Sequence, residues 1–476
     1  MINYRFEEIT EKLKQLYNSW SGVPAETIGP LPVSGSSRAY FRIKGKKETV
    51  VGAFNANTTE NKAFFYLTNH FRKKGLPVPE LLIQSKDNDF YLIEDLGDTT
   101  LLKYLTINDD VDYEKVKSIY PRVIHHLIEF QFSGHQGLDY SNAYPREAFD
   151  RQSIQWDLNY FKYLFLKLLQ VEFDEQALEH DFNIFADYLL SFDHDYFMFR
   201  DFQSRNIMIR DEKLYYIDYQ GGRKGALAYD VASLLFESKT NIPVSLKETL
   251  LEDYIRQISK HLTINASGFH KQYYAYALVR LMQALGAYGY RGLYENKPLF
   301  VPSIYPGTQN LQYIAGKLGL KKNLPELYRC FDIVQEKGKA YQPLEGNALT
   351  VSVQSFSYRG KLPVDPSGNG GGFYFDCRGL PNPGRSEAYK HLTGKNKAVQ
   401  DYLLQQDSFH AFINNAREMV DASVKNYFDR GFKHLMVCFG CTGGQHRSVF
   451  SAEIMANHLK NNYPMVRVVL KHNQIE

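Results

Sequence analysis

A chain of 476 residues is too long for a single hydrophobic core, and about three compact units are expected. Its 44% hydrophobic and 23% charged residues are typical of a soluble globular protein, and four cysteines exclude a disulfide framework. No apolar run reaches the length of a membrane span, and the charged N-terminus excludes a signal peptide, so we expect a cytoplasmic protein without a membrane partner.

The charge is distributed unevenly along the chain. Residues 346–476 carry 15 Lys and Arg against 10 Asp and Glu, a net charge of +5, which leaves 41 against 43, a net charge of −2, for the rest. A basic surplus can attract phosphates or RNA, but one of this size is modest and is also compatible with a role in solubility alone.

The N-terminal part of the chain predicts a small lobe of strands and helices. Residues 4–20 have the pattern of an amphipathic helix, and the alternating stretch from Ile28 to Phe54 favours strands. A second helix is expected from Thr59 to Lys74, because Gly75 and the prolines after it are typical stop signals. The next strand, FYLIEDLGD, runs into an acidic connection. This order is the one expected of an N-terminal kinase lobe.

Two further regions follow. Residues 113–335 are mostly helical by periodicity, with one β-rich insertion, NIMIRDEKLYYIDYQ. After the stretch 336–347, strands alternate with helices, which predicts a mostly parallel sheet covered on both faces. We therefore divide the chain into an N-lobe at 1–97, a C-lobe at 98–335, a linker at 336–347 and an α/β domain at 348–476.

The strongest catalytic signal lies in FMFRDFQSRNIMI and the following YYIDYQ. Phosphoryl transfer needs a carboxylate to orient the acceptor hydroxyl, and an amide with a second carboxylate to hold Mg²⁺. Asp201 and Asn206 share one short loop, and Asp218 ends the next strand, which returns it to the same cleft. Taken one at a time, these residues could equally be turn caps.

This order of Asp-x4-Asn, a hairpin and a hydrophobic run into Asp resembles the aminoglycoside phosphotransferase family. VSGSSRAYFRI, FRKKGLPVPELL, YLIEDLGDTTLLKYL and ALAYDVASLL have counterparts there in the same order. They look most like the subgroup that phosphorylates N-acetylmuramate and N-acetylglucosamine at the anomeric hydroxyl. The resemblance implies an α+β bilobal protein-kinase-like fold that uses ATP and Mg²⁺. It also implies these roles: base, Asp201; metal ligands, Asn206 and Asp218; ATP phosphate loop, Ser34, Gly35, Ser36 and Ser37; adenine contact, Glu94, Asp95 and Leu96.

The chain departs from that family at two places. Phe199 stands where the catalytic loop usually begins with His, and Gly52 lies near the position of the phosphate-gripping Lys. Glu60, which would pair with that Lys, then has no obvious partner in the sequence, so a lobe that binds nucleotide without turnover stays possible. For the acceptor pocket we single out Trp156, Asp157 and Tyr160 on one helix and Arg291 on a later loop, although an aromatic helix face is more often core.

The segment HLMVCFGCTGGQHRSVF predicts a phosphate site. A strand enters a loop of small residues that opens into a helix, whose N-terminal N–H groups attract an anion. Thr442, His446, Arg447 and Ser448 add hydroxyl and charged donors. Cys441 and Arg447 also fit the C-x5-R spacing of cysteine phosphatases, which is an alternative. The lone CxxC has no further ligands at a spacing suited to zinc.

This region resembles the C-terminal domain of the RapZ family through VSVQSFSYRGKLP, FDCRGLPNP, HLTGKNKAV and CTGGQHRSV. That family uses the domain to bind glucosamine 6-phosphate and a small regulatory RNA. The family's N-terminal P-loop, GxxxxGK[ST], does not occur in this chain. The resemblance implies these anion ligands: Thr442, Gly443, Gly444, Gln445, His446, Arg447 and Ser448, with Asp376, Arg378 and Asn382 on the facing loop.

Three functional hypotheses follow. The first is an ATP- and Mg²⁺-dependent amino-sugar kinase fused to a sensor of a phosphorylated amino sugar. The second is an RNA-binding or phosphosugar-responsive adapter whose kinase-like part only binds nucleotide. The third is a kinase for another small alcohol, such as choline or homoserine.

Overall fold

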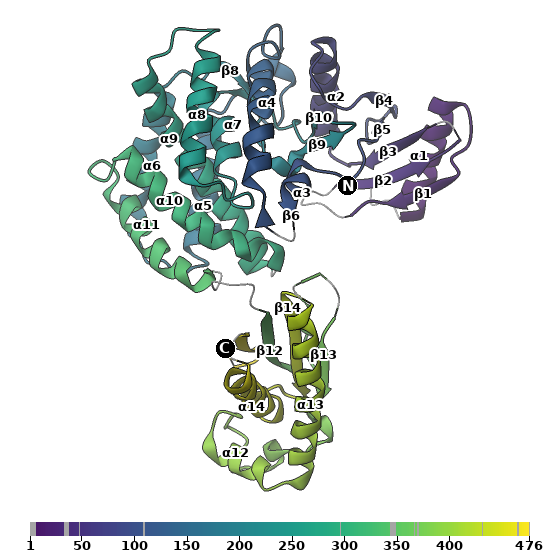
Figure 1. Ribbon diagram of the computed structural model, residues 1–476, viewed down its shortest axis with the longest axis vertical. Helices are drawn as coiled ribbons and strands as arrows, with labels where there is room; N and C mark the ends of the chain where they lie inside the picture. Colours follow the sequence, from purple (N-terminus) through teal and green to yellow (C-terminus); the bar gives the residue numbers. More distant parts are fainter. Residues whose placement is uncertain are drawn as a thin grey trace. The chain divides into compact units, whose positions relative to one another are not determined.

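A computed structural model describes residues 6–32, 38–46, 48–107, 110–295, 297–342, 349–365, 367–368, 371–430, 432–463 and 466–475. The chain forms two compact units, Met1–Asn296 with Ser303–Tyr341, and Lys297–Pro302 with Gln342–Glu476 (Figure 1). The first unit runs into the stretch that we predict as linker, because its last long helix continues to Gly338 and a 3-10 turn follows at Lys339–Tyr341.

The N-lobe is a five-stranded antiparallel sheet with the strand order β1-β2-β3-β5-β4. Helix α1 covers one face, where Leu13 and Tyr17 pack against Phe41, Ile43 and alternate residues of the other strands. Helix α2 lies on the other face. The bounds are α1 Phe6–Ser21, β1 Thr27–Pro30, β2 Ala39–Lys44, β3 Thr49–Phe54, α2 Thr58–Lys73, β4 Leu81–Gln84 and β5 Phe90–Glu94.

The C-lobe is mostly helical, as its periodicity predicts. Helix α9 is buried along most of its length and packs against α5, α7 and α10. The strands β8 and β11 form an antiparallel pair, and the β9–β10 hairpin lies between them in the chain. The polar residues of the predicted catalytic segment lie in the connections between these strands. The helices are α3 Leu101–Leu105, α4 Tyr113–Gln131, α5 Arg151–Phe161, α6 Glu175–Leu190, α7 Leu227–Leu235, α8 Val244–Ile258, α9 Ala266–Tyr288, α10 Ile304–Leu318 and α11 Pro325–Gly338. The strands are β6 Thr106–Ile107, β7 Asp110–Val111, β8 Tyr196–Met198, β9 Ile207–Arg210, β10 Lys213–Tyr216 and β11 Arg223–Gly225.

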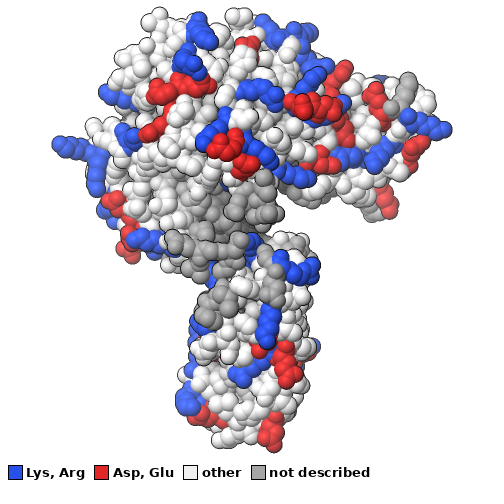
Figure 2. Space-filling view, in the orientation of Figure 1, with Lys and Arg blue, Asp and Glu red and all other residues white. Residues whose placement is uncertain are grey.

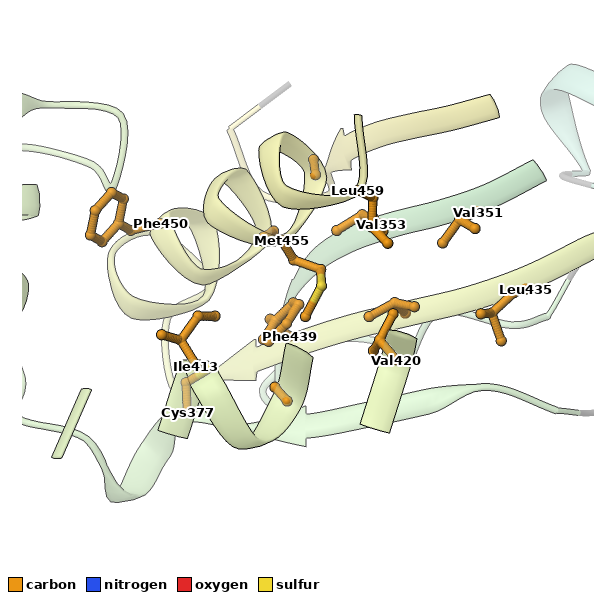
Figure 3. Packing of buried hydrophobic residues seen from close by; sticks show 14 of the residues in the cluster. Val351, Val353, Cys377, Ile413, Val420, Leu435, Phe439, Phe450, Met455 and Leu459 are labelled. Carbon is orange, nitrogen blue, oxygen red and sulfur yellow. The ribbon is translucent and has the colours of Figure 1, made fainter. Parts of the chain in front are cut away.

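The C-terminal unit is an α/β domain with a parallel four-stranded sheet of order β13-β14-β12-β15. Its main core joins strand residues such as Val353 and Phe439 to Val420 of α13 and Met455 of α14 (Figure 3). The bounds are β12 Thr350–Ser357, β13 Phe373–Asp376, α12 Lys397–Leu404, α13 Asp407–Asp429, β14 His434–Cys441, α14 Arg447–Asn462 and β15 Arg467–His472.

Both long helices of this unit pack on the same face of the sheet, because residues of α13 and of α14 belong to one core cluster. The expectation that helices cover both faces was wrong. The connections β13–α13–β14 and β14–α14–β15 advance across the sheet in the same direction, and right-handed crossovers then place their helices on one side. A smaller cluster of Phe356, Met436 and Cys438 lies on the opposite face.

None of the described helices combines the length and the apolar character that crossing a bilayer requires. On the face drawn in Figure 2, Lys and Arg side chains are interspersed with Asp and Glu over both units.

Candidate functional site

The structure brings Asp201, Asn206 and Asp218 together at one place in the first unit. Asn206 Nδ2 donates to the backbone carbonyl of Asp201 at 2.9 Å and to Asp218 Oδ2 at 3.2 Å. Since both neighbours are acceptors, the amide nitrogen must face them. The Asn206 Oδ1 atom therefore points the other way. The three residues form a compact set of oxygen donors, as their spacing predicts.

The electrostatics of this set suit a divalent cation. The Asp218 side chain is exposed on one side, yet the surrounding protein and the carboxylate of Asp201 both raise its pKa. Gln220 partly offsets this with a hydrogen bond of 2.7 Å to Asp218 Oδ1. A bound cation would relieve the repulsion between the two carboxylates, and carboxylate and amide oxygens are ligands that Mg²⁺ accepts. The described residues hold no cluster of three His, Cys, Asp or Glu around a metal position, and this set is two Asp with one Asn.

A buried carboxylate fixes the start of the catalytic loop. Asp230 accepts hydrogen bonds from the backbone N–H groups of Phe199 at 2.6 Å and Arg200 at 2.9 Å. Burial raises the pKa of Asp230 to about 7, although these two hydrogen bonds oppose the shift. The role of Asp230 is thus to hold the backbone that carries Asp201.

Arg200 and Asp157 form the second support of this loop. Arg200 has a left-handed backbone, with φ of 83°, and its guanidinium donates to both oxygens of Asp157 at 2.8 and 2.6 Å and to the Tyr229 hydroxyl at 2.7 Å. Asp157, which we expected in the acceptor pocket, is 5% exposed and uses both oxygens on Arg200. We therefore assign Asp157 to support of the catalytic loop.

Phe199 fills the place of the usual His by aromatic packing. Its ring is 1% exposed and lies 5.5 Å from the ring of Phe130 and 5.2 Å from that of Phe202. The loop is therefore anchored by apolar contacts at this position and by Asp230 at its backbone.

Arg280 belongs to the site although its sequence position did not single it out. From α9 its Nη2 approaches Asp201 Oδ1 at 3.4 Å, and its Nε donates to the Ser233 hydroxyl at 3.0 Å. The side chain is buried, so a positive charge lies next to the predicted base in an environment with little water. One signal existed in the sequence, namely a lone charge within the otherwise apolar run YAYALVRLMQAL.

The predicted nucleotide contacts are only partly visible. Ser34, Gly35, Ser36 and Ser37 lie outside the described residues. Glu94 pairs with Arg210 at 2.8 Å and Asp95 with Arg42 at 2.7 Å, so both carboxylates brace the connection between the lobes. Leu96 is buried. The predicted contact with adenine would then be made by the backbone of this connection and by apolar side chains.

Of the remaining acceptor candidates, Trp156 lies apart from Tyr160 and Arg291. Trp156 is 48% exposed and stacks with Arg146, whose guanidinium carbon is 5.8 Å from the indole centre. Arg291 lies in the π-helical turn Gly289–Tyr294 and donates to Glu295 at 2.8 Å. The charge of Arg291 also acts on Tyr160, whose pKa is raised by burial in spite of it. Tyr160 and Arg291 are thus neighbours, whereas Trp156 faces the surface.

In the C-terminal unit, the loop after β14 has the predicted strand–loop–helix form. The strand ends at Cys441, and α14 begins at Arg447. Ser357 Oγ donates to the carbonyl of Thr442 at 2.8 Å, which ties the loop to β12. Gly444 has φ of 68°, and a β-carbon there would lie 3.0 Å from the backbone nitrogen of Ser357 and against Gln474. Only glycine suits this position.

Several of the predicted anion ligands instead hold the loop in shape. Arg447 is buried and its Nη1 donates to the carbonyls of Arg378 and Leu380, both at 2.9 Å. His446 Nε2 lies 2.9 Å from the carbonyl of Tyr389. On the facing loop, Asp376 pairs with Arg378 at 2.7 Å and Asn382 Oδ1 accepts from Gly384 N at 3.2 Å. Gly443 and Gln445 are exposed, so an anion would reach the loop at their backbone.

The thiol of Cys441 lies at the centre of the same loop. Burial raises its pKa, but hydrogen bonds from the Ser448 hydroxyl and from the N–H groups of Ser448 and Gly444, with the charge of Arg447, outweigh burial and lower the pKa below its usual value. The residue is only 3% exposed, and Arg447 is turned to two carbonyls. Both observations speak against the cysteine-phosphatase alternative.

Comparison with known proteins agrees with this geometry. Residues 27–263, which include Asp201, Asn206 and Asp218, match the phosphotransferase enzyme family, and residues 349–476 match the RapZ C-terminal domain. The chain carries a phosphotransferase domain followed by a RapZ C-terminal domain.

Relatives of known sequence cover only a part of the chain. A nucleotide-binding protein of Clostridium botulinum is 36% identical over 122 residues, which are 26% of this chain and 40% of that protein. A nucleotide-binding protein of Alkaliphilus oremlandii is 35% identical over 128 residues, 27% of this chain and 42% of that protein. The chain thus spans less than half the length of these relatives.

Among solved structures, choline kinase LicA from Streptococcus pneumoniae is 13% identical with a TM-score of 0.44, over 65% of this chain and 99% of that one. Spectinomycin phosphotransferase in complex with ADP and spectinomycin is 12% identical with a TM-score of 0.41, over 70% of this chain and 98% of that one.

The residues that we predict as metal ligands in the phosphotransferase domain give a first prediction. Asp218→Asn keeps the shape of the side chain and removes its charge. The gain in ADP affinity that Mg²⁺ brings should therefore shrink by about tenfold or more, because the loss of a group that only supports a metal ligand already lowers metal affinity by that factor. Titration calorimetry with ADP, with and without Mg²⁺, measures this gain. Gln220→Ala, which removes only a hydrogen bond to Asp218, is the control and should change it little. An undiminished gain in Asp218→Asn would show that Asp218 is not a metal ligand.

The loop of the RapZ C-terminal domain gives a second prediction through two neighbouring glycines. Gly444→Ala should destabilise this domain by about 1–3 kcal/mol, the cost of a left-handed backbone at a residue other than glycine, and the contacts with Ser357 and Gln474 add to it. Gly443→Ala should be tolerated, because a β-carbon there meets no described atom within 4 Å. Urea unfolding of the two variants compares them directly. Equal stability of the two would contradict the loop geometry.

Proposed function

We propose that the phosphotransferase domain transfers the γ-phosphoryl group of ATP to a hydroxyl of an amino sugar, with the anomeric hydroxyl of N-acetylmuramate or N-acetylglucosamine as acceptor. The observation that carries the proposal is the hydrogen-bonded set of Asp201, Asn206 and Asp218 on one loop and the adjoining hairpin. A carboxylate for the acceptor and hard oxygen ligands for a cation are the groups that phosphoryl transfer needs.

In this reaction each residue of the site has a separate role. Asp201 accepts a hydrogen bond from the acceptor hydroxyl, orients it toward the γ-phosphorus and takes its proton as the new O–P bond forms and the bond to the β-phosphate oxygen breaks. Asn206 and Asp218 would hold Mg²⁺, which when bound neutralises charge on the phosphates. Arg280 lies beside Asp201 and restricts its orientation. Asp230 and the Arg200–Asp157 pair keep the loop in place for this step.

The choice of acceptor rests on two separate resemblances that point to amino-sugar metabolism. Tyr160 and Arg291 supply an aromatic ring and a cation near each other, which suits a polar sugar. We further propose that the RapZ C-terminal domain senses a phosphorylated amino sugar, bound at the loop from Thr442 to Ser448.

A screen for ADP release tests the acceptor class. The full chain with ATP and Mg²⁺ should release ADP in the presence of N-acetylmuramate or N-acetylglucosamine, and much less with choline, homoserine or an aminoglycoside. Release with choline or homoserine instead would keep the phosphotransferase and reject the amino sugar. Release that does not depend on any acceptor would reject both.

RNA binding by the C-terminal domain is a second candidate, favoured by the surplus of 15 basic over 10 acidic residues in 346–476. Filter binding across a salt series tests it, because contacts to RNA phosphates give a steep loss of affinity with salt. Binding that is weak and insensitive to salt would leave ligand sensing as the role of this domain.

A further inference from the structure

The N-lobe lacks a cation on the strand that in kinases carries the phosphate-binding lysine. A β-carbon at Gly52 of β3 would lie 2.9 Å from Leu13 of α1 and 2.9 Å from Ile43, so a side chain at this position points into the core under α1 and away from α2. Its neighbours Val51 and Ala53 face the α2 side, because strand residues alternate, and neither is charged. The lysine is therefore absent from β3 on the α2 side as well.

The face of the sheet toward α2 does carry a cation, on the neighbouring strand. Phe41 and Ile43 of β2 belong to the core under α1, so alternation places Tyr40 and Arg42 on the α2 side, and Arg38 directly before the strand falls in the same series. The α2 side is confirmed on β5, where Tyr91 packs against Phe65 of α2 with ring centres 5.2 Å apart.

Arg38 is the ion-pair partner of Glu60, for which the sequence indicated none. Its Nη2 lies 2.8 Å from Oε1 of Glu60 on α2, and the Arg38 side chain is 4% exposed. Asn55 Nδ2 holds the second oxygen of Glu60 at 3.1 Å. Glu60 is thus fixed from two sides and positions the guanidinium, as the glutamate of a kinase helix positions the lysine.

The helix that fixes Arg38 also contacts the metal end of the site. Thr68 of α2 lies 2.6 Å from the hydroxyl of Tyr219, which directly follows Asp218 in the chain. Arg42 of the same series is committed elsewhere, because it pairs with Asp95 at 2.7 Å and with Asp98 at 2.9 Å. Lys44 at the end of β2 is exposed. Arg38 is therefore the buried cation of this series, and Glu60 of α2 holds it.

We propose that Arg38, held by Glu60, binds the phosphates of the nucleotide in place of the lysine that β3 lacks. The proposal rests on the proposed phosphotransferase function and adds the group that holds the donor. A guanidinium can keep a carboxylate on one edge and grip phosphate oxygens with another, and its charge does not depend on pH in the physiological range.

Nucleotide binding to the full chain, measured by titration calorimetry with ADP and with adenosine, tests this without relying on turnover. Arg38→Ala should weaken ADP binding by at least about tenfold, the value of a charge-assisted hydrogen bond, and leave adenosine binding unchanged. Arg38→Lys keeps the charge and should lie between the wild type and Arg38→Ala. Arg72→Ala, an exposed arginine of α2 that pairs with Glu80 at 3.7 Å, is the matched control and should bind ADP as the wild type does.

The outcomes separate the two proposals. If the wild type binds ADP and Arg38→Ala binds it equally well, Arg38 is not the phosphate ligand, while the phosphotransferase function stands. If the wild type binds neither ADP nor ATP, both proposals fall. Should Arg38→Ala not fold, as shown by its unfolding curve, Arg38→Lys decides: ADP affinity equal to the wild type overturns the inference, because a point charge cannot reproduce the guanidinium fork.

Discussion

Asp201→Asn should lower the turnover number for phosphorylation of the acceptor by about 10²–10⁴-fold, the usual contribution of a positioned general base. The substitution removes the proton acceptor and the negative charge that faces Arg280. Asn206 binds the backbone carbonyl of Asp201, which the variant retains, so the predicted metal ligands keep their arrangement. ADP affinity should therefore stay near the wild-type value, and coupled measurement of ADP release with calorimetry separates the two effects.

Asp211→Asn provides a matched control for this prediction. Asp211 lies in the turn between β9 and β10, and its side chain is 86% exposed. The same change of charge at this position should leave turnover unaffected. If Asp201→Asn retained full turnover, the assignment of the base would be wrong, and if it lost ADP affinity as well, Asp201 would be a ligand of the nucleotide–metal complex.

Arg200→Met should destabilise the phosphotransferase domain by about 3 kcal/mol or more, the cost of leaving one member of a buried ion pair without its partner. Asp157 would remain buried next to an apolar side chain, and the hydroxyl of Tyr229 would lose its donor. Turnover should fall too, because Arg200 directly precedes Asp201 and its left-handed backbone depends on these contacts. Urea unfolding followed by circular dichroism gives the free energy.

An exposed ion pair of α5, the helix that also carries Asp157, serves as the control. Arg151 of α5 pairs with Asp187, and the two side chains are 47% and 69% exposed. Arg151→Met should therefore cost less than about 1 kcal/mol. A loss in Arg200→Met no larger than that in Arg151→Met would show that the Arg200–Asp157 pair does not support the catalytic loop.

The parts of the site that lie close in sequence could be predicted, and the parts that depend on packing could not. Asp201, Asn206 and Asp218 are separated only by a short loop and a hairpin, so strand and turn patterns suffice to bring them together. Arg280 reaches Asp201 from α9 across 79 positions, and only the packing of α9 makes that contact. The role of Asp157 was missed for the same reason, because Arg200 lies 43 positions away.

In the N-lobe, the role that a residue can take depends on the face of the strand on which it lies. Gly52 lies near the expected lysine position in the sequence, but its alternation with Ala53 places it toward α1. The ion pair of Arg38 and Glu60 joins the start of β2 to α2, and no spacing in the sequence predicts it. In the C-terminal domain, the small residues correctly indicate a tight loop. The inward turn of His446 and Arg447 depends on carbonyl groups of a distant segment, at Tyr389, Arg378 and Leu380.

Phosphorus NMR of the full chain with ATP, Mg²⁺ and N-acetylglucosamine or N-acetylmuramate tests the central claim most directly. We expect a new phosphomonoester signal, split by coupling to the anomeric proton of the sugar, that grows as the γ-phosphate signal of ATP declines and is absent with Asp201→Asn. If ATP is stable in this mixture and with every other alcohol tried, or if it yields only inorganic phosphate, the chain does not transfer a phosphoryl group to these acceptors and the account is contradicted.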